Sequence, residues 1–562
     1  MAYFLKKSSQ SKSSSKGLYL QIYESFRNKE KKCSSHRCYK SLGYYNDLVA
    51  SGIIDPISYY QAEVDELNKK VKESKIQKIS DENPVKFNLG FFLLKSMIDK
   101  LKVDDFIFLM TQKDNHQYLI SSLIRQLIYA RVVYPCSKYR TVKKVFNTLL
   151  SSSDISLDQV YDGISYIGND YQKYIDIFNH QINKIYGRKT DVCYFDCTNY
   201  YFEIDLPKED KQKGPSKENR TEPIIGQALL LDENQIPIAM EMYPGNESEK
   251  PYIRKLISNM KERYNISGKT VQVADKGLNC GQNIFEALKN KDGYVFSKSV
   301  HGKNLSDIEK KWVLLDNDYV IVNDDKGNPI YKIKECVDDF EYKFEIDGKK
   351  YKYKFREKRV VTYNFALARK QQAEIRKQVD KAQSLTAIKT IQREEYGDAV
   401  KYVNFDGTCS LNLNKIAEDM KFAGYNMIVT SEIDKSAQEI YDIYHGLWRI
   451  EESFRITKSY LDARPVYLQK KESIYGHFLI CYLALVILRL LEFKVFKGKL
   501  NTYEIIDFIR DYSVTKAIND IYINTAHQSK ALDVIKKELS LPFLDNSFLD
   551  TKNISVVLKA KL

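Results

Sequence analysis

The sequence predicts an α/β protein built on a mixed β-sheet, with a helical region before the sheet and a β-rich insertion inside it. Two apolar runs, 192–196 (VCYFD) and 271–275 (VQVAD), have the pattern of buried strands that each end in an aspartate. Two more strand-like segments and an amphipathic helix lie between these runs. Residues 88–187, by contrast, carry apolar side chains at helical spacing.

The residues before the sheet predict small elements followed by helices. Residues 6–16 (KKSSQSKSSSK) have the composition of a flexible basic arm. Short β-prone pieces between 18 and 48 indicate a small hairpin element, and a charged helix follows near 60–80. Later, Ser137-Lys138-Tyr139-Arg140 opens another helix. This basic start suits contact with a phosphate backbone and suits plain packing equally well.

The order of the elements predicts which strands of the sheet are neighbours. A strand ends at Asp196, the segments 224–231 and 236–243 form a hairpin, a helix covers 249–264, and a fourth strand ends at Asp275. This β-β-β-α-β order, with acids at the ends of strands one and four, is similar to the opening of a ribonuclease-H-like sheet. That fold places strand one beside strand four, so we expect the two aspartates to lie close together. Two unrelated surface acids are the alternative.

Residues 291–420 exceed what a core sheet needs, and their pattern predicts a β-rich insertion. The predicted elements are a strand at 312–322, turns at 324–328 and 346–350, and a basic helix at about 366–385. Alternation in 351–355 (YKYKF) exposes one basic face of a strand. A further strand at 425–430 precedes the next helix.

The segment 436–461 predicts a helix that carries a third acid. Steps of three and four residues place Tyr444, Leu447, Glu451, Phe454 and Lys458 on one face. An unpaired carboxylate among apolar side chains is costly, so Glu451 indicates a functional role. The neighbouring Glu452 points away from this face and is the weaker candidate. An amphipathic helix that tolerates a glutamate is the alternative.

Asp196, Asp275 and Glu451 together predict a metal site. Hard divalent cations prefer oxygen ligands, and a pair of such cations suits phosphodiester chemistry. We therefore expect two Mg²⁺ ions as cofactors, with Mn²⁺ able to replace them.

Composition favours a polyanionic partner. The 562 residues have a formal net charge of +14, from 88 Lys and Arg against 74 Asp and Glu. This charge favours nucleic acid over a membrane, although a general Lys-rich bias gives the same balance. The nine Cys lack the paired spacing of a zinc site. The long apolar run 474–491 contains His477 and Arg489 and predicts a buried helix and not a membrane span.

Several motifs give the chain a resemblance to a known family. YHGLWRIEESFRITK (444–458) is similar to the Tyr-Arg-Glu-Lys signature of DDE transposases from bacterial insertion sequences. The other matching segments are FDCTNYYFE (195–203), GPSKENR (214–220), YPGNESE (243–249), VADKGLNCGQNI (273–284) and SYLDARPVY (459–467). The resemblance covers about 90–500, with the motifs in the family's order. In one departure, Leu447 stands where the signature has Arg, and Arg455 is better placed than Arg449 to supply that charge.

The resemblance implies a transposase with a ribonuclease-H-like catalytic domain. Such an enzyme binds the terminal inverted repeats of its own element, cleaves the ends with Mg²⁺ and joins them to target DNA, as a homodimer on DNA in the bacterial cytoplasm. Asp196, Asp275 and Glu451 would be its catalytic and metal-binding residues. The expected DNA-binding residues are Tyr444, Arg455, Lys458, Trp448, Trp312, Lys217, Arg220, Asn246 and Lys276, with either Trp a candidate for stacking on a flipped base.

The motifs and patterns together predict five regions. These are an N-terminal basic arm and small β/α element (1–87), a helical DNA-binding domain (88–187), a catalytic domain (188–290 and 421–495), a β-rich insertion domain with a basic helix (291–420) and a C-terminal helical region (496–562).

Two other functions stay open at this point. One is a non-catalytic protein or repressor, derived from a decayed transposase, that binds the element's ends. The other is a structure-specific nuclease that cuts without strand transfer. Metal-dependent nicking of an end duplex separates the first alternative from a transposase, and strand-transfer products separate the second.

Overall fold

Two units, 1–84 and 85–562, make up the chain in this computed structural model. The structure describes residues 2–9, 17–27, 34–75, 86–114, 116, 118–150, 154–218, 221–301, 305–346, 348–386, 393–405, 409–517 and 521–562.

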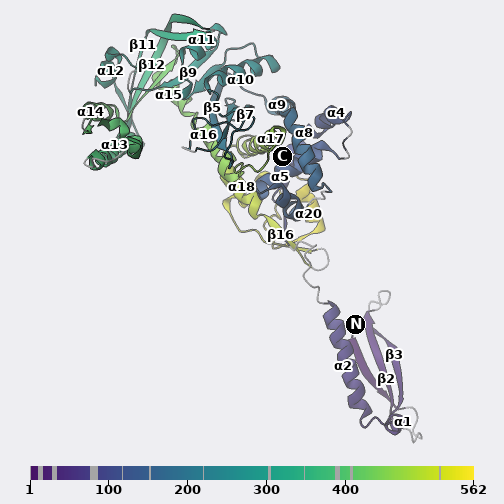
Figure 1. Cartoon of the computed structure of the whole chain (residues 1–562). Helices are drawn as coiled ribbons and strands as arrows, with labels where there is room; N and C mark the ends of the chain where they lie inside the picture. The colour runs from purple at the N-terminus through teal and green to yellow at the C-terminus, as the bar shows by residue number, and fades with distance from the viewer. Residues whose placement is uncertain are drawn as a thin grey trace. The chain divides into compact units, whose positions relative to one another are not determined.

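The first unit is a three-stranded antiparallel sheet with a helix packed on one face (Figure 1). Its elements are β1 (Ala2–Ser8), β2 (Tyr19–Arg27), β3 (Ser34–Tyr44), α1 (Tyr45–Ala50) and α2 (Pro56–Lys75). Leu20 and Ile22 of β2 and Val64 of α2 are buried. The Asn68 side chain of α2 makes two hydrogen bonds with the backbone of Tyr3, at 2.7 and 2.9 Å. This small unit therefore has a core of its own.

The prediction of a flexible arm for 6–16 is wrong for residues 6–8. Residues 6–8 belong to β1 and pair in register with β2, from Lys6↔Gln21 to Ser8↔Tyr19. Backbone pairing thus overrides the Ser- and Lys-rich composition at this point. Residues 10–16 lie outside the described part of the chain.

The larger unit contains a nine-stranded sheet in the order β10-β11-β12-β15-β9-β8-β5-β6-β7 (Figure 1). The bounds are β5 (Val192–Tyr201), β6 (Ile224–Leu231), β7 (Pro237–Pro244), β8 (Val271–Ala274), β9 (Gly293–Lys298), β10 (Val320–Asn323), β11 (Pro329–Ile346), β12 (Lys349–Asn364) and β15 (Tyr425–Thr430). Strands β5, β8 and β9 are parallel, and every other neighbouring pair is antiparallel. The sheet is thus mixed, as the sequence predicts.

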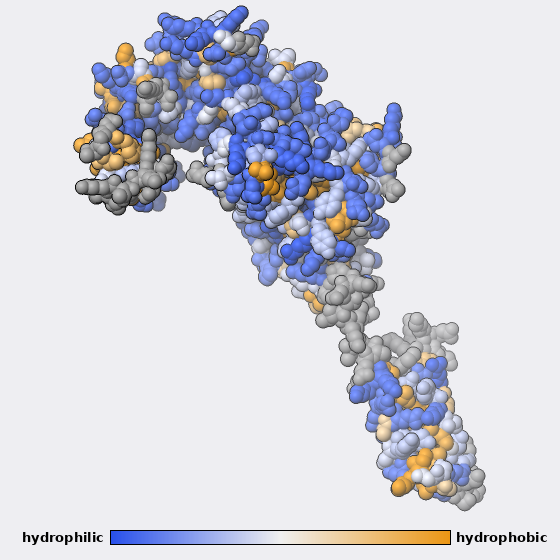
Figure 2. Space-filling view, in the orientation of Figure 1, coloured by the Kyte–Doolittle hydropathy of each residue, from blue (hydrophilic) through white to orange (hydrophobic). Residues whose placement is uncertain are grey.

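Strands β10, β11 and β12, which follow β9 in the chain, extend this sheet. β11 and β12 make a long hairpin in which Tyr331 pairs with Asn364 and Ile346 with Lys349. Figure 2 shows a largely hydrophilic surface at this end of the larger unit. The strand predicted at 312–322 is wrong in its first half, because Ser306 and Glu309 form a capping box that starts helix α12 (Asp307–Leu314).

Helices complete the insertion between β9 and β15. α13 (Phe365–Thr386) follows β12 directly, close to the basic helix predicted at 366–385. Together with η4 (Arg393–Tyr402) and α14 (Leu413–Phe422) it encloses a small separate core. Tyr396 and Tyr402 are almost fully buried in that core.

A second group of helices surrounds the long apolar helix α17 (Lys471–Leu490) (Figure 1). The bounds of these helices are α3 (Phe92–Leu101), α4 (Val103–Thr111), α5 (Ile120–Val133), α8 (Leu157–Asn169), α9 (Tyr171–Tyr186) and α18 (Thr502–Asp511). Among the described residues, 471–495 is the one helical stretch whose length and composition would allow it to cross a membrane, and 94% of its apolar window is buried inside the protein. A helix that is apolar on all sides belongs to a core, so we describe α17 as a core helix.

The helical region predicted for 496–562 is only partly helical. After α18 come β16 (Ser513–Lys516), β17 (Ile521–Asn524), α19 (Lys530–Glu538), β18 (Phe548–Asp550) and α20 (Thr551–Leu558). The strands form a small sheet, β18-β17-β16-β4, whose last member is β4 (Lys86–Asn88). Strands this short form because a distant segment pairs with them, and local patterns do not reveal such a partner.

α17 crosses α8 at a point where two glycines allow the helix backbones to touch. A Cβ on Gly476 would overlap the carbonyl oxygen of Ile164 in α8, and a Cβ on Gly168 would overlap that of Glu472 in α17. We predict that Gly476→Ala lowers the free energy of unfolding by about 1–3 kcal/mol, because two backbones must separate to admit the methyl group. Gly268→Ala is the matched control, since a Cβ there meets no atom within 4 Å. Urea denaturation of both variants checks this, and equal stabilities would contradict it.

Candidate active site

The parallel pairing of β5 and β8 brings the two predicted aspartates to one region. Phe195 pairs with Ala274, so Asp196 and Asp275 occupy the next level of adjacent strands. Asp275 directly follows β8 and precedes the short turn η2 (Lys276–Leu278). The sequence predicted that the first strand ends at Asp196, and this is wrong. Asp196 lies in the middle of β5, which continues to Tyr201.

Asp196 is in an environment that disfavours its charge. Burial raises the pKa of Asp196 to about 6, and the negative charges of Glu249 and Asp275 add to this effect. The Lys217 ammonium and the backbone N–H of Cys197, 2.7 Å from Asp196 Oδ1, act in the opposite direction. This carboxyl group is therefore close to several charged groups and only half-buried from solvent.

Tyr444 connects the second aspartate to the helix that precedes the one with the third acid. Its hydroxyl donates a hydrogen bond to Asp275 Oδ1 at 3.2 Å. Burial raises the pKa of Tyr444 well above its ordinary value, and the charges of Asp275 and Glu451 both contribute. Tyr444 belongs to α15 (Ala437–His445), whereas Glu451 is exposed on α16 (Trp448–Arg455), which packs against β5. The single helix predicted for 436–461 is thus divided near 446.

Lys217 is shared between two carboxylates. Its ammonium lies 3.6 Å from Asp196 and 3.4 Å from Glu249, and it also donates a hydrogen bond to the carbonyl oxygen of Cys197. Although burial lowers the pKa of Lys217, the charges of Asp196 and Glu249 raise it above its ordinary value. Glu249 was not among the residues selected from the sequence, although it ends the quoted segment 243–249.

The segments that hold Lys217 and Glu249 meet at two glycines. A Cβ on Gly214 would overlap the carbonyl oxygen of Gly245, and a Cβ on Gly245 would overlap that of Ile224. Only residues without a side chain fit there. The loops 214–218 and 245–249 are consequently held together beside β5.

Lys458 is engaged in a second ion cluster. Its ammonium lies 3.0 Å from Glu218, which is also ion-paired with Arg464. Burial raises the pKa of Glu218, but hydrogen bonds from Arg464 and Lys458 outweigh burial and lower it below its ordinary value. A phosphate contact by Lys458 would therefore require exchange of Glu218 for the phosphate.

The other predicted DNA-binding residues differ in their exposure to solvent and in their contacts with other residues. Trp448 is 49% exposed, with the Arg449 guanidinium 3.8 Å from its ring centroid. Trp312 is half-buried against the core of the sheet, and the Lys334 ammonium contacts both its ring and its carbonyl oxygen. Asn246 and Lys276 are exposed, and Arg455 lies beside the Tyr503 hydroxyl. Arg220 lies outside the described residues.

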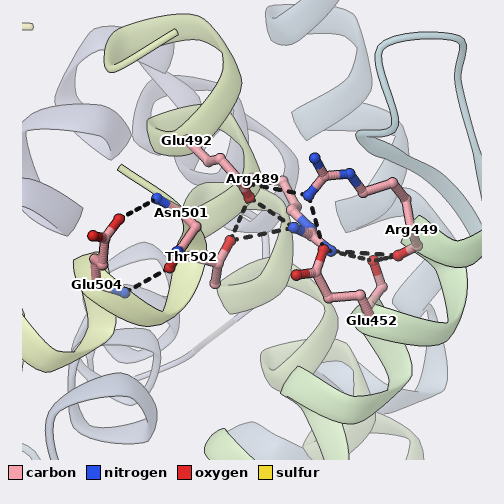
Figure 3. A network of polar contacts seen from close by, with 8 residues as sticks. Arg449, Glu452, Arg489, Glu492, Asn501, Thr502 and Glu504 are labelled. Carbon is pink, nitrogen blue, oxygen red and sulfur yellow. Dashed lines mark hydrogen bonds and ion pairs between the residues drawn. The ribbon is translucent and has the colours of Figure 1, made fainter. Parts of the chain in front are cut away.

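A buried charge network fixes α16 to α17 and α18 (Figure 3). Arg489, which is fully buried, makes ion pairs with Glu452 at 2.8 Å and with Glu492 at 2.7 Å. Arg449 contacts the same two carboxylates at 3.0 and 3.4 Å. Thr502 of α18 donates a hydrogen bond to Glu492 at 2.7 Å. Sequence reasoning ranked Glu452 as a weak catalytic candidate and did not identify this network.

The carboxylates suit a divalent cation by their chemistry. All are hard oxygen donors, and a cation would offset the burial and the neighbouring negative charges that raise the pKa of Asp196, as Lys217 already does in part. Within the part of the chain that the structure describes, however, no three His, Cys, Asp or Glu side chains are gathered closely enough to hold one ion.

A comparison with known families identifies the central part of the chain. The family described as "Transposase DDE domain" matches residues 201–487, which is more than half of the 562 residues. The matched range contains Asp275, Tyr444 and Glu451 and begins at Tyr201, the last residue of the strand that contains Asp196. No curated protein matches the chain.

The raised pKa of Asp196 predicts a pH-dependent contribution to stability. An unfolded aspartate titrates near pH 3.9, so between about pH 4 and pH 6 the folded state binds more protons than the unfolded state, and the contribution of Asp196 to stability falls as the pH rises. Asp196→Asn removes this effect and should raise the free energy of unfolding at pH 7.5 by up to about 3 kcal/mol. Urea denaturation at pH 4 and pH 7.5 measures this, with the exposed Asp205→Asn as the control. A variant that is less stable at pH 7.5 would contradict the prediction.

The network at Arg489 predicts a large loss of stability on truncation. Arg489→Met leaves Glu452 and Glu492 buried without their main partner, so we expect the free energy of unfolding to fall by about 3–5 kcal/mol. Lys499→Met is the control, because it removes an exposed pair with Glu538 at 2.5 Å and should cost less than about 1 kcal/mol. Calorimetric unfolding compares the two variants. A similar small effect of both changes would show that the buried network does not anchor α16.

Proposed function

We propose a DNA-cleaving and DNA-joining function, because the chain belongs to the transposase DDE domain family. In this proposal the protein is a transposase of a bacterial insertion sequence. It binds the terminal inverted repeats of its own element, cleaves the ends and transfers them to target DNA. The single observation that carries the proposal is the placement of Asp196 and Asp275 on adjacent parallel strands, with Tyr444 connecting Asp275 to the helices that lead to Glu451.

The strand order supports a ribonuclease-H-like catalytic domain. Its core would be β7-β6-β5-β8-β9, in which the first three strands in sequence are antiparallel and the next two run parallel to β5. The insertion then enters after β9 and continues the same sheet through β12 and β11. In open α/β sheets ligands bind where the strand order reverses, and the order reverses between β5 and β8.

Asp196, Asp275 and Glu451 would hold the metal. Two bound Mg²⁺ ions, or Mn²⁺ in their place, would supply an activated water and charge stabilisation for the leaving 3′ oxygen. The carboxylates act as ligands and not as proton carriers. The described residues contain no assembled set of three ligands, so the proposal includes closure of these carboxylates on the metal when DNA binds.

The surrounding residues would position the DNA. Tyr444 keeps Asp275 oriented through its hydrogen bond, and Lys217 leaves Asp196 for a phosphate oxygen when the negative charge of Asp196 is otherwise compensated. Lys458 exchanges Glu218 for a phosphate in the same way. Trp448, which is more exposed than Trp312, is the better candidate to stack on a displaced base.

The remaining parts of the proposal follow from the family and from charge. The net charge of +14 suits a duplex DNA partner. Cleavage and joining of two ends call for two active sites, so we propose a homodimer on DNA, in the cytoplasm and on the nucleoid. The helices in 92–186 are proposed to contact DNA at the element's ends.

A specific observation favours one alternative. Lys217 occupies the neighbourhood of Asp196, and Leu447 stands where the signature has Arg. A decayed transposase that binds and represses its own ends without cutting would show these features too.

Cleavage assays decide between these functions. We expect the full-length protein, with Mg²⁺ present, to nick a labelled duplex that bears the end of the surrounding element. Asp196→Asn or Glu451→Gln should reduce the nicking rate at least about 100-fold, because a two-metal site fails without a ligand. DNA affinity should stay within about threefold. Glu262→Gln, an exposed acid on α10 (Lys250–Arg263), is the matched control. Nicking that survives in Glu451→Gln would remove Glu451 from the site, and no nicking by any protein would favour the repressor.

A further inference from the structure

A cavity of about 160 Å³ joins two segments that the sequence singled out and that the proposed function does not use. One is the basic helix start at 137–140, and the other is the segment 459–467. The cavity is lined by residues of both segments and of helices α5 and α17, among them Arg131, Ser137, Lys138, Asp462, Tyr467 and His477. None of Asp196, Asp275 and Glu451 lines it.

Three basic side chains are buried around this cavity. Arg131, Lys138 and His477 are each at most 6% exposed. The Arg131 guanidinium donates three hydrogen bonds of 3.3–3.4 Å, all to backbone carbonyl oxygens. A guanidinium keeps its charge at every ordinary pH, and carbonyl oxygens satisfy its N–H groups without neutralising that charge. The wall of the cavity therefore carries at least one permanent positive charge.

The hydrogen bonds of His477 show which member of its pair with Lys138 is the donor. His477 Nε2 lies 3.0 Å from the carbonyl oxygen of Ala463, so this nitrogen carries the hydrogen of the ring. Nδ1 is then the acceptor, and the Lys138 ammonium, 3.2 Å away, donates to it. Burial and the charges of Lys138 and Arg131 lower the pKa of His477 well below its ordinary value, which agrees with a neutral ring. An ammonium has three donors, and this bond uses one of them.

Neither cation at the cavity makes an ion pair with a carboxylate of the described residues. Asp462 lines the cavity, but its side chain is exposed and is paired with neither Arg131 nor Lys138. The buried Arg489 and Arg359 differ, because each of them contacts two glutamates. In the described chain, the positive charge at this cavity is thus left without the compensation that other buried arginines have.

The uncompensated charge has a cost that a bound anion would offset. Burial, and after it the charge of Arg131, lowers the pKa of Lys138 to about 7. Keeping this ammonium charged inside the protein is therefore unfavourable. An anion beside Lys138 and Arg131 supplies the opposite charge and favours the charged form of the lysine. The lining consequently has the chemistry of an anion-binding site.

We propose that this cavity binds a phosphate group. Arginine and lysine are the usual ligands of phosphate, and a free or terminal phosphate carries up to two negative charges near neutral pH, which matches the two cations. An apolar cavity of about 150 Å³ holds a molecule as small as benzene, whereas a drug-sized ligand needs about 300 Å³ or more. A volume of about 160 Å³ therefore suits one small oxyanion.

The phosphate has two possible sources with the same chemistry, namely inorganic phosphate and the terminal phosphate of a nucleotide chain. A phosphodiester inside a duplex carries one charge and has a sugar on both sides, so it suits a small cavity with buried cations less well. The inference uses no residue of the candidate active site and does not rest on the proposed function.

Isothermal titration calorimetry of the full-length chain with sodium phosphate tests the proposal, at constant ionic strength and near neutral pH. We expect saturable binding of one phosphate per chain, with a dissociation constant of about 1 mM or lower. Lys138→Met should weaken this binding at least about tenfold, because it removes one of the two charges and keeps an unbranched side chain. Its melting temperature without phosphate should equal or exceed that of the unaltered chain, since a buried charge is lost.

Lys144→Met is the matched control, because Lys144 is exposed on the next helical segment, η1 (Thr141–Val145), and the charge change is identical. This variant should bind phosphate within about twofold of the unaltered chain.

Ser137→Asp is a second variant that keeps the local fold. Ser137 caps α6 (Lys138–Arg140) by accepting a hydrogen bond from the backbone N–H of Arg140 at 3.3 Å, and aspartate is an equally good cap. The new carboxylate at the cavity should weaken phosphate binding at least about tenfold by repulsion.

Three results would overturn the proposal. The first is the absence of saturable phosphate binding by the unaltered chain, which would leave water as the occupant. The second is an equal loss of binding in Lys138→Met and Lys144→Met, which would reduce the effect to general charge. The third is undiminished binding in both Lys138→Met and Ser137→Asp.

A short single-stranded oligonucleotide, with and without a 5′-phosphate, identifies the source of the phosphate. Binding at least about tenfold tighter with the 5′-phosphate, and lost in Lys138→Met, assigns the cavity to the end of a nucleic acid. Saturable binding of inorganic phosphate with no effect of the 5′-phosphate assigns it to the free ion. Failure of the proposed function is seen separately, because phosphate binding and its loss in Lys138→Met persist even where no variant nicks DNA.

Discussion

The parallel pairing of β5 and β8 places Asp196 and Asp275 side by side, and the contacts of the candidate site follow from this placement. Adjacent strands are about 4.8 Å apart, so aspartates at the same level of both strands repel each other. The chain reduces this repulsion with Lys217 at Asp196 and with the Tyr444 hydroxyl at Asp275. Burial is the larger cause of the raised pKa of Asp196, and the charges of Glu249 and Asp275 add to it. A site that costs stability in the free protein is one that a bound cation can stabilise.

The sequence predicted the features that depend on local pattern. Asp196 and Asp275 stand in or beside apolar runs with strand periodicity, and the order of the elements is enough to make β5 and β8 neighbours. Glu451 was selected because helical spacing placed it among apolar residues, yet Glu451 is exposed and Glu452 is the buried acid. The division of the helix near 446 shifts its faces, and a pattern that assumes one continuous helix does not anticipate this shift.

The features that were missed depend on contacts between distant segments. Lys217 meets Glu249 because two loops touch at Gly214 and Gly245, and Arg489 meets Glu452 from a helix 37 residues further along the chain. In the same way, residues 6–8 look like a flexible arm until β2 provides hydrogen-bond partners. Composition describes what a segment prefers alone, and pairing with a remote strand or charge overrides that preference.

The buried network gives α16 a defined rotation about its own axis. Replacing buried ion pairs with apolar residues often leaves stability unchanged or improves it, so stability alone does not account for Arg489 on an otherwise apolar helix. Ile450 and Phe454 are buried on the same helix, so their packing and the ion pairs of Glu452 set the same rotation. Arg489 and Arg449 hold the Glu452 carboxylate inward, which leaves Glu451 on the outer side of the same helix. The network thus helps to fix which of the two glutamates faces outward, and this is the placement that the proposed role of Glu451 requires.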